Sequence, residues 1–336
     1  IGCCIGFVRN PVCYNYFLMA NISAKLVTPV PTKSSPTLLR QIIKQRHAYF
    51  YIGPALLIMA IVLLYPLIYT VILSFYDTPA RSPDYIFVGL RNYTELFNHQ
   101  LFWLVMRNTL SWTIGSTITS FILGLAAALL VNNRVPFMGL FKALLVIPYV
   151  LGHVTAAYLW RWLMHPDLGF ISLALQEAGL VSQPIPFLQD GNMVMASLVL
   201  VNTWKTFPFV MIMLLAGLQA IPQELYKAAR VDGANSFQQF IEITIPQLMP
   251  VILVTTVLTV IGNFNSFTIP WVMTGGGPAN QSEIIITWIY GTGIRNLRYG
   301  FASTISVVLF IILSVFSFYY VRVLTRGSDR SAEFEG

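Results

Sequence analysis

The sequence predicts an all-α membrane protein with about six transmembrane helices. Of its 336 residues, 56% are hydrophobic and 10% are charged, and its mean hydropathy is +0.69. Soluble domains carry about 25% charged residues, so this composition excludes an ordinary soluble protein. Six apolar segments are each long enough to cross roughly 30 Å of hydrocarbon at about 1.5 Å per helical residue. These segments cover residues 49–75, 110–131, 143–164, 194–220, 247–274 and 301–322.

The stretch before the first span, residues 1–48, is expected to be a cytoplasmic lead. The first internal methionine that precedes a small residue is Met19, so residues 1–18 are expected to be upstream or non-native sequence. Apolar and basic side chains are interleaved over residues 39–46, which predicts a short amphipathic helix at the inner membrane surface. All three cysteines lie within the first 13 residues and indicate neither a disulfide framework nor a metal site.

The basic residues predict the orientation of the spans. If the N-terminus is inside, the inner segments carry 13 Lys and Arg, whereas the outer segments carry 5. The positive-inside rule therefore predicts that both termini are cytoplasmic, with a membrane domain over 49–322 and a tail over 323–336. The net charge of +7 is explained by this flanking role, so no nucleic-acid partner is expected. The inner segments are 1–48, 132–142, 221–246 and 322–336.

The polar segment 221–246 predicts a helix, a turn and a second helix in the cytoplasm. Pro222 suits a first helical turn, and Gly233 can adopt the left-handed conformation that ends a helix. Ser236, followed three residues later by Gln239, is a capping-box pattern and predicts that a second helix begins there. That helix is expected to end before Pro246.

The first of these two helices predicts a docking surface for another protein. Ala228 and Ala229 stand side by side and leave a shallow spot that a partner can approach closely. The remaining side chains keep the surface compatible with water. They are Glu224, Lys227, Arg230 and Asp232. The alternative is an ordinary amphipathic connector, which any protein with several spans can have.

The spacing of this segment resembles the EAA loop in permease subunits of binding-protein-dependent ABC importers. Lys227 stands where the family commonly has Glu, and Ile245 where it commonly has Leu. The resemblance implies the type I importer permease fold, with this segment as the cytoplasmic coupling helix held by the ATPase subunit. The difference at Lys227 means that a charge contact of the family cannot be transferred to this position. The residues implied in coupling are Glu224, Ala228, Ala229, Asp232, Gly233, Ile243 and Pro246.

Three further segments are similar to the carbohydrate-type, or maltose-type, branch of these permeases. They are Phe-Val-Gly-Leu-Arg-Asn-Tyr at 87–93, Trp-Arg-Trp-Leu-Met-His-Pro-Asp-Leu-Gly at 160–169, and Thr-Gly-Gly-Gly-Pro at 274–278. Aromatic residues at a membrane interface and a flexible turn are the alternative interpretations. The resemblance covers roughly residues 50–322.

Polar residues inside two apolar segments predict a pathway through the membrane. Lys205 lies close to the middle of the fourth segment, where an ammonium costs roughly 2.5–3.5 kcal/mol unless it faces a cavity or a partner. The fifth segment interleaves amides and hydroxyls with aromatic rings, a combination that suits a sugar. Snorkelling of the lysine and polar contacts between helices are the alternatives. The candidate pathway residues are Asn202, Trp204, Lys205, Asn263, Phe264, Asn265, Phe267, Thr268 and Trp271.

Several kinds of chemistry have no motif in this chain. No G-x-x-x-x-G-K-[ST] loop occurs, and the four histidines are scattered without metal-ligand spacing. No catalytic constellation is recognisable from spacing. The chain is therefore expected to be no enzyme, to hold no metal and to bind no cofactor itself, with ATP and Mg²⁺ bound by a partner ATPase.

These patterns together predict a permease subunit of an ABC sugar importer in the cytoplasmic (inner) membrane of a bacterium or archaeon. The resemblance implies a second related permease, a dimer of ATPase subunits and an external sugar-binding protein as partners, with the lipid bilayer around them. A permease for another solute, such as a glycerol-phosphate derivative, stays open. An ion-coupled secondary transporter and a membrane-embedded enzyme are the less favoured alternatives.

Overall fold

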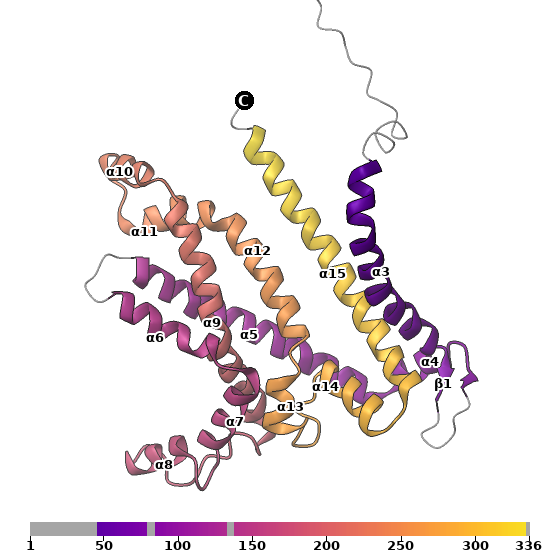
Figure 1. Cartoon of the computed structure of the whole chain (residues 1–336). Helices are drawn as coiled ribbons and strands as arrows, with labels where there is room; N and C mark the ends of the chain where they lie inside the picture. Colours follow the sequence, from indigo (N-terminus) through magenta and orange to yellow (C-terminus); the bar gives the residue numbers. More distant parts are fainter. Residues whose placement is uncertain (1–45, 79–84, 133–137, 334–336) are drawn as a thin grey trace, which may run out of the picture. The chain divides into compact units, whose positions relative to one another are not determined.

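The computed structural model describes residues 46–78, 85–132 and 138–333, and the described chain is mainly helical (Figure 1). It divides into two units, residues 1–65 and 66–336. The described part of the first unit is the beginning of helix α3 (Arg46–Leu73). The predicted cysteine-containing lead and most of the predicted amphipathic helix lie outside the described residues.

Five helical stretches within the described residues are long and apolar enough to cross a membrane. They are 51–73, 100–132, 191–220, 236–274 and 299–322. A sixth crossing requires α6 (Met138–Val150) and α7 (His153–Leu163) together, and these two helices are bent by 95° at the break between them. All six predicted segments thus have a counterpart, but the third is a broken span and not one continuous helix.

The second span begins well before the predicted boundary. Helix α5 (Gln100–Asn132) starts ten residues earlier than the predicted segment 110–131, and α4 (Arg91–Asn98) precedes it. The polar residues Asn108 and Thr109 lower the hydropathy of this first part of α5, so the predicted span began after them. Both side chains are buried against the loop before α14 (Ile285–Tyr290): the Asn108 amide donates to the Glu283 carbonyl at 3.1 Å, and the Ile285 N–H donates to the Thr109 hydroxyl at 2.9 Å.

The 87–93 segment fastens the end of α3 to the neighbouring helices. Strands β1 (Tyr76–Asp77) and β2 (Ile86–Phe87) pair antiparallel. The Asn92 amide then donates to the carbonyls of Ser74 and Tyr76, at 3.0 and 2.9 Å. The Ser74 carbonyl also accepts from Thr304, in α15 (Tyr299–Glu333), at 3.1 Å. This segment therefore has a structural role within residues 66–336.

Helices α5 and α9 (Gly191–Ala220) form the most extensive helix pair. Small and hydroxyl-bearing side chains of α5 line the contact, and a Cβ on Gly124 would come within 2.8 Å of Val210. Ser120 and Thr206 share a hydrogen bond of 2.8 Å across the pair. Small residues let helix backbones approach in lipid, where packing and hydrogen bonds replace the hydrophobic drive for association.

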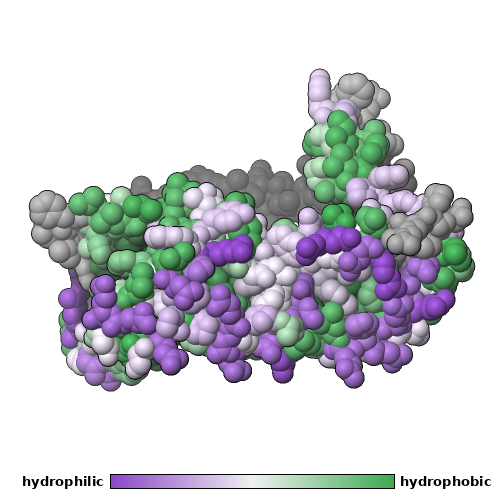
Figure 2. Space-filling view, turned by 90° about the horizontal axis from the view of Figure 1, so that it is seen from below, coloured by the Kyte–Doolittle hydropathy of each residue, from purple (hydrophilic) through white to green (hydrophobic). Residues whose placement is uncertain are grey.

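The two ends of α9 carry different structures. Helix α10 (Gln223–Val231) follows its C-terminal end, whereas α8 (Phe170–Glu177) lies toward its N-terminal end (Figure 1). Figure 2 looks onto the side that carries α8, and there hydrophilic residues form a broad patch bordered by hydrophobic ones. The polar connections of the chain thus gather beyond the apolar helices, as expected for a protein that crosses a bilayer.

Candidate functional site

The turn between α10 and the next helix is built on Gly233. Its φ is +82°, in the left-handed region predicted from the sequence. The backbone N–H groups of Asp232 and Ala234 close α10 by donating to the carbonyls of Ala228 and Ala229, at 3.0 and 2.9 Å. A Cβ at Gly233 would meet no atom within 4 Å. The requirement for glycine is therefore conformational and not one of space.

The restart of the chain after this turn differs from the prediction by one residue. Asn235, not Ser236, is the N-cap of α11 (Ser236–Gln239). Its side-chain oxygen accepts from Gln238 N at 2.9 Å, and the Gln238 side chain accepts from Asn235 N at 2.8 Å. The predicted capping residue Gln239 instead donates to the Ala234 carbonyl at 2.9 Å. Asn235 with Gln238 and Ser236 with Gln239 both fit a capping-box pattern, and the structure forms the first of these pairs.

The second helix does not end before Pro246 as predicted. It continues through a π-helical turn, η1 (Phe240–Thr244), into α12 (Ile245–Phe264), with Pro246 in the first turn of α12. A proline is tolerated in a first helical turn, where its missing N–H costs little. The Thr244 hydroxyl lies 2.9 Å from the Tyr226 hydroxyl of α10. The turn thus joins α10 directly to the start of a membrane span.

The α10–α11 loop presents an exposed surface made of both polar and apolar side chains. No residue of α10 or α11 is buried. Ala229 and Ile243 are half-buried, and the other predicted coupling residues, Glu224, Ala228, Asp232, Gly233 and Pro246, are exposed. Val231 and Phe237 were not predicted, yet they are 87% and 72% exposed. Two large apolar residues in a polar loop are the sequence signal that could have identified them.

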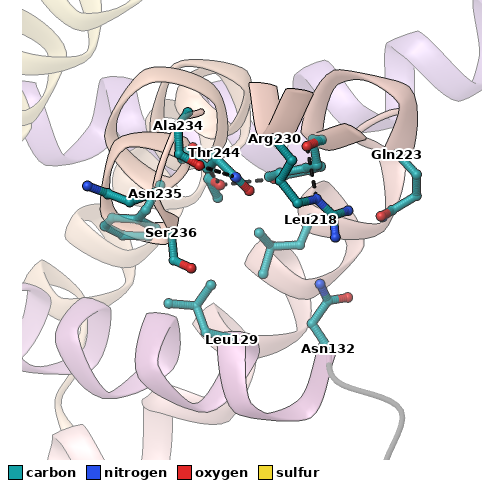
Figure 3. A pocket seen from close by; sticks show the side chains of 12 residues that line it. Leu129, Asn132, Leu218, Gln223, Arg230, Ala234, Asn235, Ser236 and Thr244 are labelled. Carbon is teal, nitrogen blue, oxygen red and sulfur yellow. Dashed lines mark hydrogen bonds between the residues drawn. The ribbon is translucent and has the colours of Figure 1, made fainter. Parts of the chain in front are cut away.

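A cavity of about 700 Å³ lies behind this loop (Figure 3). It separates α10 and α11 from the ends of α5 and α9, and its lining contains one charged residue, Arg230. The Arg230 Nε donates to the Tyr226 carbonyl at 3.2 Å. The loop therefore contacts the start of the α12 span through Tyr226 and Thr244, and the cavity lies beside this contact. The cavity is lined by Leu129, Asn132, Leu218, Gln223, Tyr226, Arg230, Ala234, Asn235, Ser236, Gln239, Phe240 and Thr244.

Two of the candidate pathway residues bind helix to helix. The Asn202 amide of α9 donates to the Asn263 side chain of α12 at 2.9 Å, and the Asn263 amide donates to the Thr117 hydroxyl of α5 at 3.1 Å. The Trp112 indole donates to the Asn263 carbonyl at 3.0 Å. All four residues are buried. We call Asn202, Asn263, Thr117 and Trp112 the closed polar group. Phe264, also a candidate, is buried in an adjacent apolar cluster.

Three other candidates gather at the break between α12 and α13 (Thr268–Thr274). Asn265 ends α12 and is exposed, while the rings of Phe267 and Trp271 stack with their centroids 5.4 Å apart. Tyr290 of α14 closes this arrangement, with its ring centroid 4.9 Å from Phe267 and 4.8 Å from Trp271. Tyr290 was not among the predicted residues, because it lies beyond the predicted span. We call Asn265, Phe267, Trp271 and Tyr290 the open aromatic group.

This open aromatic group borders a second cavity of about 460 Å³. Asn265, Phe267 and Tyr290 line it together with the hydroxyl residues Ser303 and Ser306 of α15. The Arg295 guanidinium lies 5.3 Å from the centroid of the Trp271 ring. Amide, hydroxyl and aromatic groups thus meet at one cavity together with aliphatic side chains, so the cavity offers both hydrogen-bonding and apolar surfaces to a ligand. Thr268, the remaining candidate of this segment, is half-buried at the start of α13.

Lys205 and Trp204 of α9 lie away from this second cavity. The Lys205 ammonium is buried and donates to the Tyr149 carbonyl, at the end of α6, at 2.7 Å. The contact rules out snorkelling in this structure, because the ammonium points to a protein carbonyl. The Trp204 ring packs edge-on against Trp160 of α7, with centroids 5.4 Å apart.

The glycine-rich loop 274–278 is held in place by buried groups. Gly275 and Gly276 have φ of +59° and +92°, and a Cβ on Gly276 would overlap the Glu283 carboxyl. Burial raises the pKa of the Glu283 carboxyl, while a hydrogen bond from Thr287 and the charge of Arg295 act in the opposite direction. Within the described residues, no group of three His, Cys, Asp or Glu side chains could hold a metal ion.

Comparisons with known proteins agree with this architecture. The model of a family described as "Binding-protein-dependent transport system inner membrane component" matches residues 120–328. A probable ABC transporter permease protein of Brucella suis is 33% identical over 84% of this chain and 97% of its own length. The trehalose/maltose transport system permease protein MalF of Thermococcus litoralis is 34% identical over 84% of this chain and 95% of its own length.

A solved structure shows the same fold. It is a chain of a bacterial ABC transporter involved in the import of the acidic polysaccharide alginate. The match has a TM-score of 0.74 at 23% identity and covers 86% of this chain and 98% of that chain. At this identity, the match shows the fold alone.

Proposed function

Since this chain belongs to the family of binding-protein-dependent transport system inner membrane components, we propose that it forms the membrane pathway for a sugar or oligosaccharide delivered by an external binding protein. The observation that carries this proposal is an exposed α10–α11 loop before α12, together with a cavity at the far end of α12 whose lining includes Asn265, Phe267 and Tyr290. The trehalose and maltose named for a relative support sugar as the solute class.

The open aromatic group is the proposed sugar contact. Its rings offer flat apolar faces for a sugar ring, and the exposed Asn265 amide offers hydrogen bonds for hydroxyls. The closed polar group has a structural role in this proposal and does not contact the sugar. It fixes the spacing of α5, α9 and α12, so that the pathway beside it has a defined width.

The α10–α11 loop is the proposed docking surface for an ATPase subunit, which binds ATP and Mg²⁺ in place of this chain. Exposed Val231 and Phe237 offer apolar anchors in the same loop as Ala228, and the π-turn transmits movement of the loop to α12. Packed interfaces tolerate added volume poorly, so a bulky side chain at half-buried Ala229 is expected to separate the docked surfaces. A second related permease completes the proposed assembly, with both termini and this loop in the cytoplasm of a bacterial or archaeal cell.

Co-purification from membranes followed by ATPase measurements tests the proposal. Hydrolysis by the assembled complex is expected to rise when the binding protein carries a sugar, and to respond differently to a panel of sugars. Stimulation by a glycerol-phosphate derivative alone would favour the second candidate solute class. Solute uptake that follows an ion gradient and continues without ATP would overturn the importer assignment.

A further inference from the structure

The break in the third span leaves helix ends without their usual partners. Pro148 lies in the last turn of α6, and α7 begins its own hydrogen bonding at Gly152, whose carbonyl accepts from Ala156 N at 2.9 Å. The Tyr149 carbonyl therefore has no N–H of a following helical turn to accept from. A carbonyl left unpaired inside a membrane is costly, since lipid offers no donor in exchange.

Lys205 of α9 resolves this problem. Its side chain is 3% exposed, its Nζ donates to the Tyr149 carbonyl at 2.7 Å, and its Nζ lies 5.3 Å from the centroid of the Tyr149 ring. Phe209, one turn along α9, stacks on the same ring with centroids 6.0 Å apart. The C-terminal end of a helix carries partial negative charge and stabilises a nearby cation. The buried ammonium and the orphaned carbonyl thus satisfy each other.

The orientation of α7 matters for the open aromatic group. Arg161, in the last turn of α7, donates to the Val272 carbonyl of α13 at 2.9 Å. Val272 is the residue after Trp271, whose ring belongs to that group. The bend between α6 and α7 therefore helps to determine where α13 places the Trp271 ring.

We propose that Lys205 is a positioning residue: by capping the C-terminal end of α6, it fixes the bend of the broken span, and through α7 and α13 it sets the geometry of the sugar-binding cavity. The inference rests on the proposed function for its transport consequence. The bend itself is measurable without any knowledge of the solute.

The test measures the bend directly, by electron-electron double resonance in the complex purified from membranes. Spin labels are attached to cysteines that replace Leu140 in α6 and Tyr158 in α7, both of which are exposed, after Cys3, Cys4 and Cys13 have been changed to Ser. Wild type is compared with Lys205→Met and Lys205→Arg. Lys142→Met is the matched control, because it removes the lysine of α6 and leaves Lys205 of α9 in place.

We expect a narrow distance distribution in wild type, Lys205→Arg and Lys142→Met, and a broadened or shifted one in Lys205→Met. Lys205→Gln, which keeps a donor without the charge, is expected to lie between them, and it carries the test if Lys205→Met does not accumulate in the membrane. Tyr149→Leu keeps the backbone carbonyl and is expected to disturb the bend less than Lys205→Met. Sugar uptake should fall about tenfold in Lys205→Met and recover in Lys205→Arg, since an unpaired buried polar group typically has an effect of this size.

An unchanged distribution in both Lys205→Met and Lys205→Gln would overturn the proposal. So would a raised KM for the sugar with an unchanged distribution, because Lys205 would then act on the solute and not on the bend. A complex that takes up no sugar in any form, wild type included, would count against the proposed function and leave the distance result intact.

Discussion

Asn263 and Asn265 are the same residue type, two positions apart near the end of α12, and the fold treats them in opposite ways. Asn263 is buried, with its side chain hydrogen-bonded to α5 and α9. Asn265 is exposed, and its amide returns to the Ile261 carbonyl of its own helix at 3.0 Å. An amide in a membrane span thus becomes part of the packing or part of a cavity according to which partners lie within hydrogen-bond distance.

The largest expected effect is a loss of stability when the closed polar group is disrupted, with no such loss for the open aromatic group. Asn263→Leu should leave the Asn202 amide and the Thr117 hydroxyl without their partner, and an unsatisfied buried group costs about 1–3 kcal/mol. The thermal unfolding temperature of the purified subunit is therefore expected to fall. Asn265→Leu is the matched control and should change it little. Equal losses in the two variants would remove the distinction between the groups.

Two left-handed glycines offer a second matched pair. Gly233 and Gly179 have φ of +82° and +71°, and neither has an atom within 4 Å of an added Cβ. Valine at either site should cost about 1–2 kcal/mol in local strain. Only Gly233→Val is expected to uncouple sugar-stimulated ATP hydrolysis, because only it redirects α11 and the π-turn. Hydrolysis lost equally in Gly179→Val would show that strain alone is responsible.

Within the open aromatic group, Trp271→Ala should reduce sugar uptake about tenfold, since an aromatic contact contributes roughly 0.5–1.5 kcal/mol beyond its buried area. The unfolding temperature should stay near that of wild type. Trp271→Phe keeps an aromatic face and should restore much of the uptake. Normal uptake by Trp271→Ala would show that this ring only packs against its neighbours and does not contact the sugar.

A smaller effect is expected for Asn265→Ala, about fivefold in uptake, because a single neutral hydrogen bond contributes roughly 1 kcal/mol. Dose–response curves of uptake against sugar-loaded binding protein measure it. Ser111→Ala, a change at an exposed polar residue of α5, is the control. An effect on assembly without an effect on uptake would contradict the assignment of Asn265 to the pathway.

The smallest effect concerns the carboxyl group of Glu283. Burial raises the pKa of this group, so protonation is more favourable in the folded protein than in the unfolded chain. Its stabilising contribution is complete below the unfolded-state pKa and is lost as the pH rises through the raised folded-state pKa. Glu283→Gln should therefore raise the unfolding temperature slightly at neutral pH, with the difference shrinking as the pH falls. A difference that grows toward acid pH would show that the charge of Arg295 outweighs burial.

Much of the fold was predictable from local sequence. The six apolar segments correspond to five candidate spans and one pair of helices bent by 95°, and Gly233 ends α10 as expected. The register of the cap after Gly233, the passage of the helix through Pro246 and the early start of α5 were predicted wrongly. The contacts of Asn108 and Thr109, the Asn235 cap and the position of Pro246 in a first helical turn explain these differences.

The class of protein, the apolar membrane segments and the position of the α10–α11 loop follow from the sequence, because apolar length and turn residues act over a few neighbouring positions. Which polar residues find hydrogen-bond partners depends on how distant segments pack together. Asn263 finds Thr117 and Asn202, and Lys205 finds the Tyr149 carbonyl, over separations of 56 to 146 residues. The open aromatic group likewise needs Tyr290 from another helix. Inside a membrane, the cost of a polar group depends on whether a partner lies within hydrogen-bond distance, and packing of distant segments sets that distance.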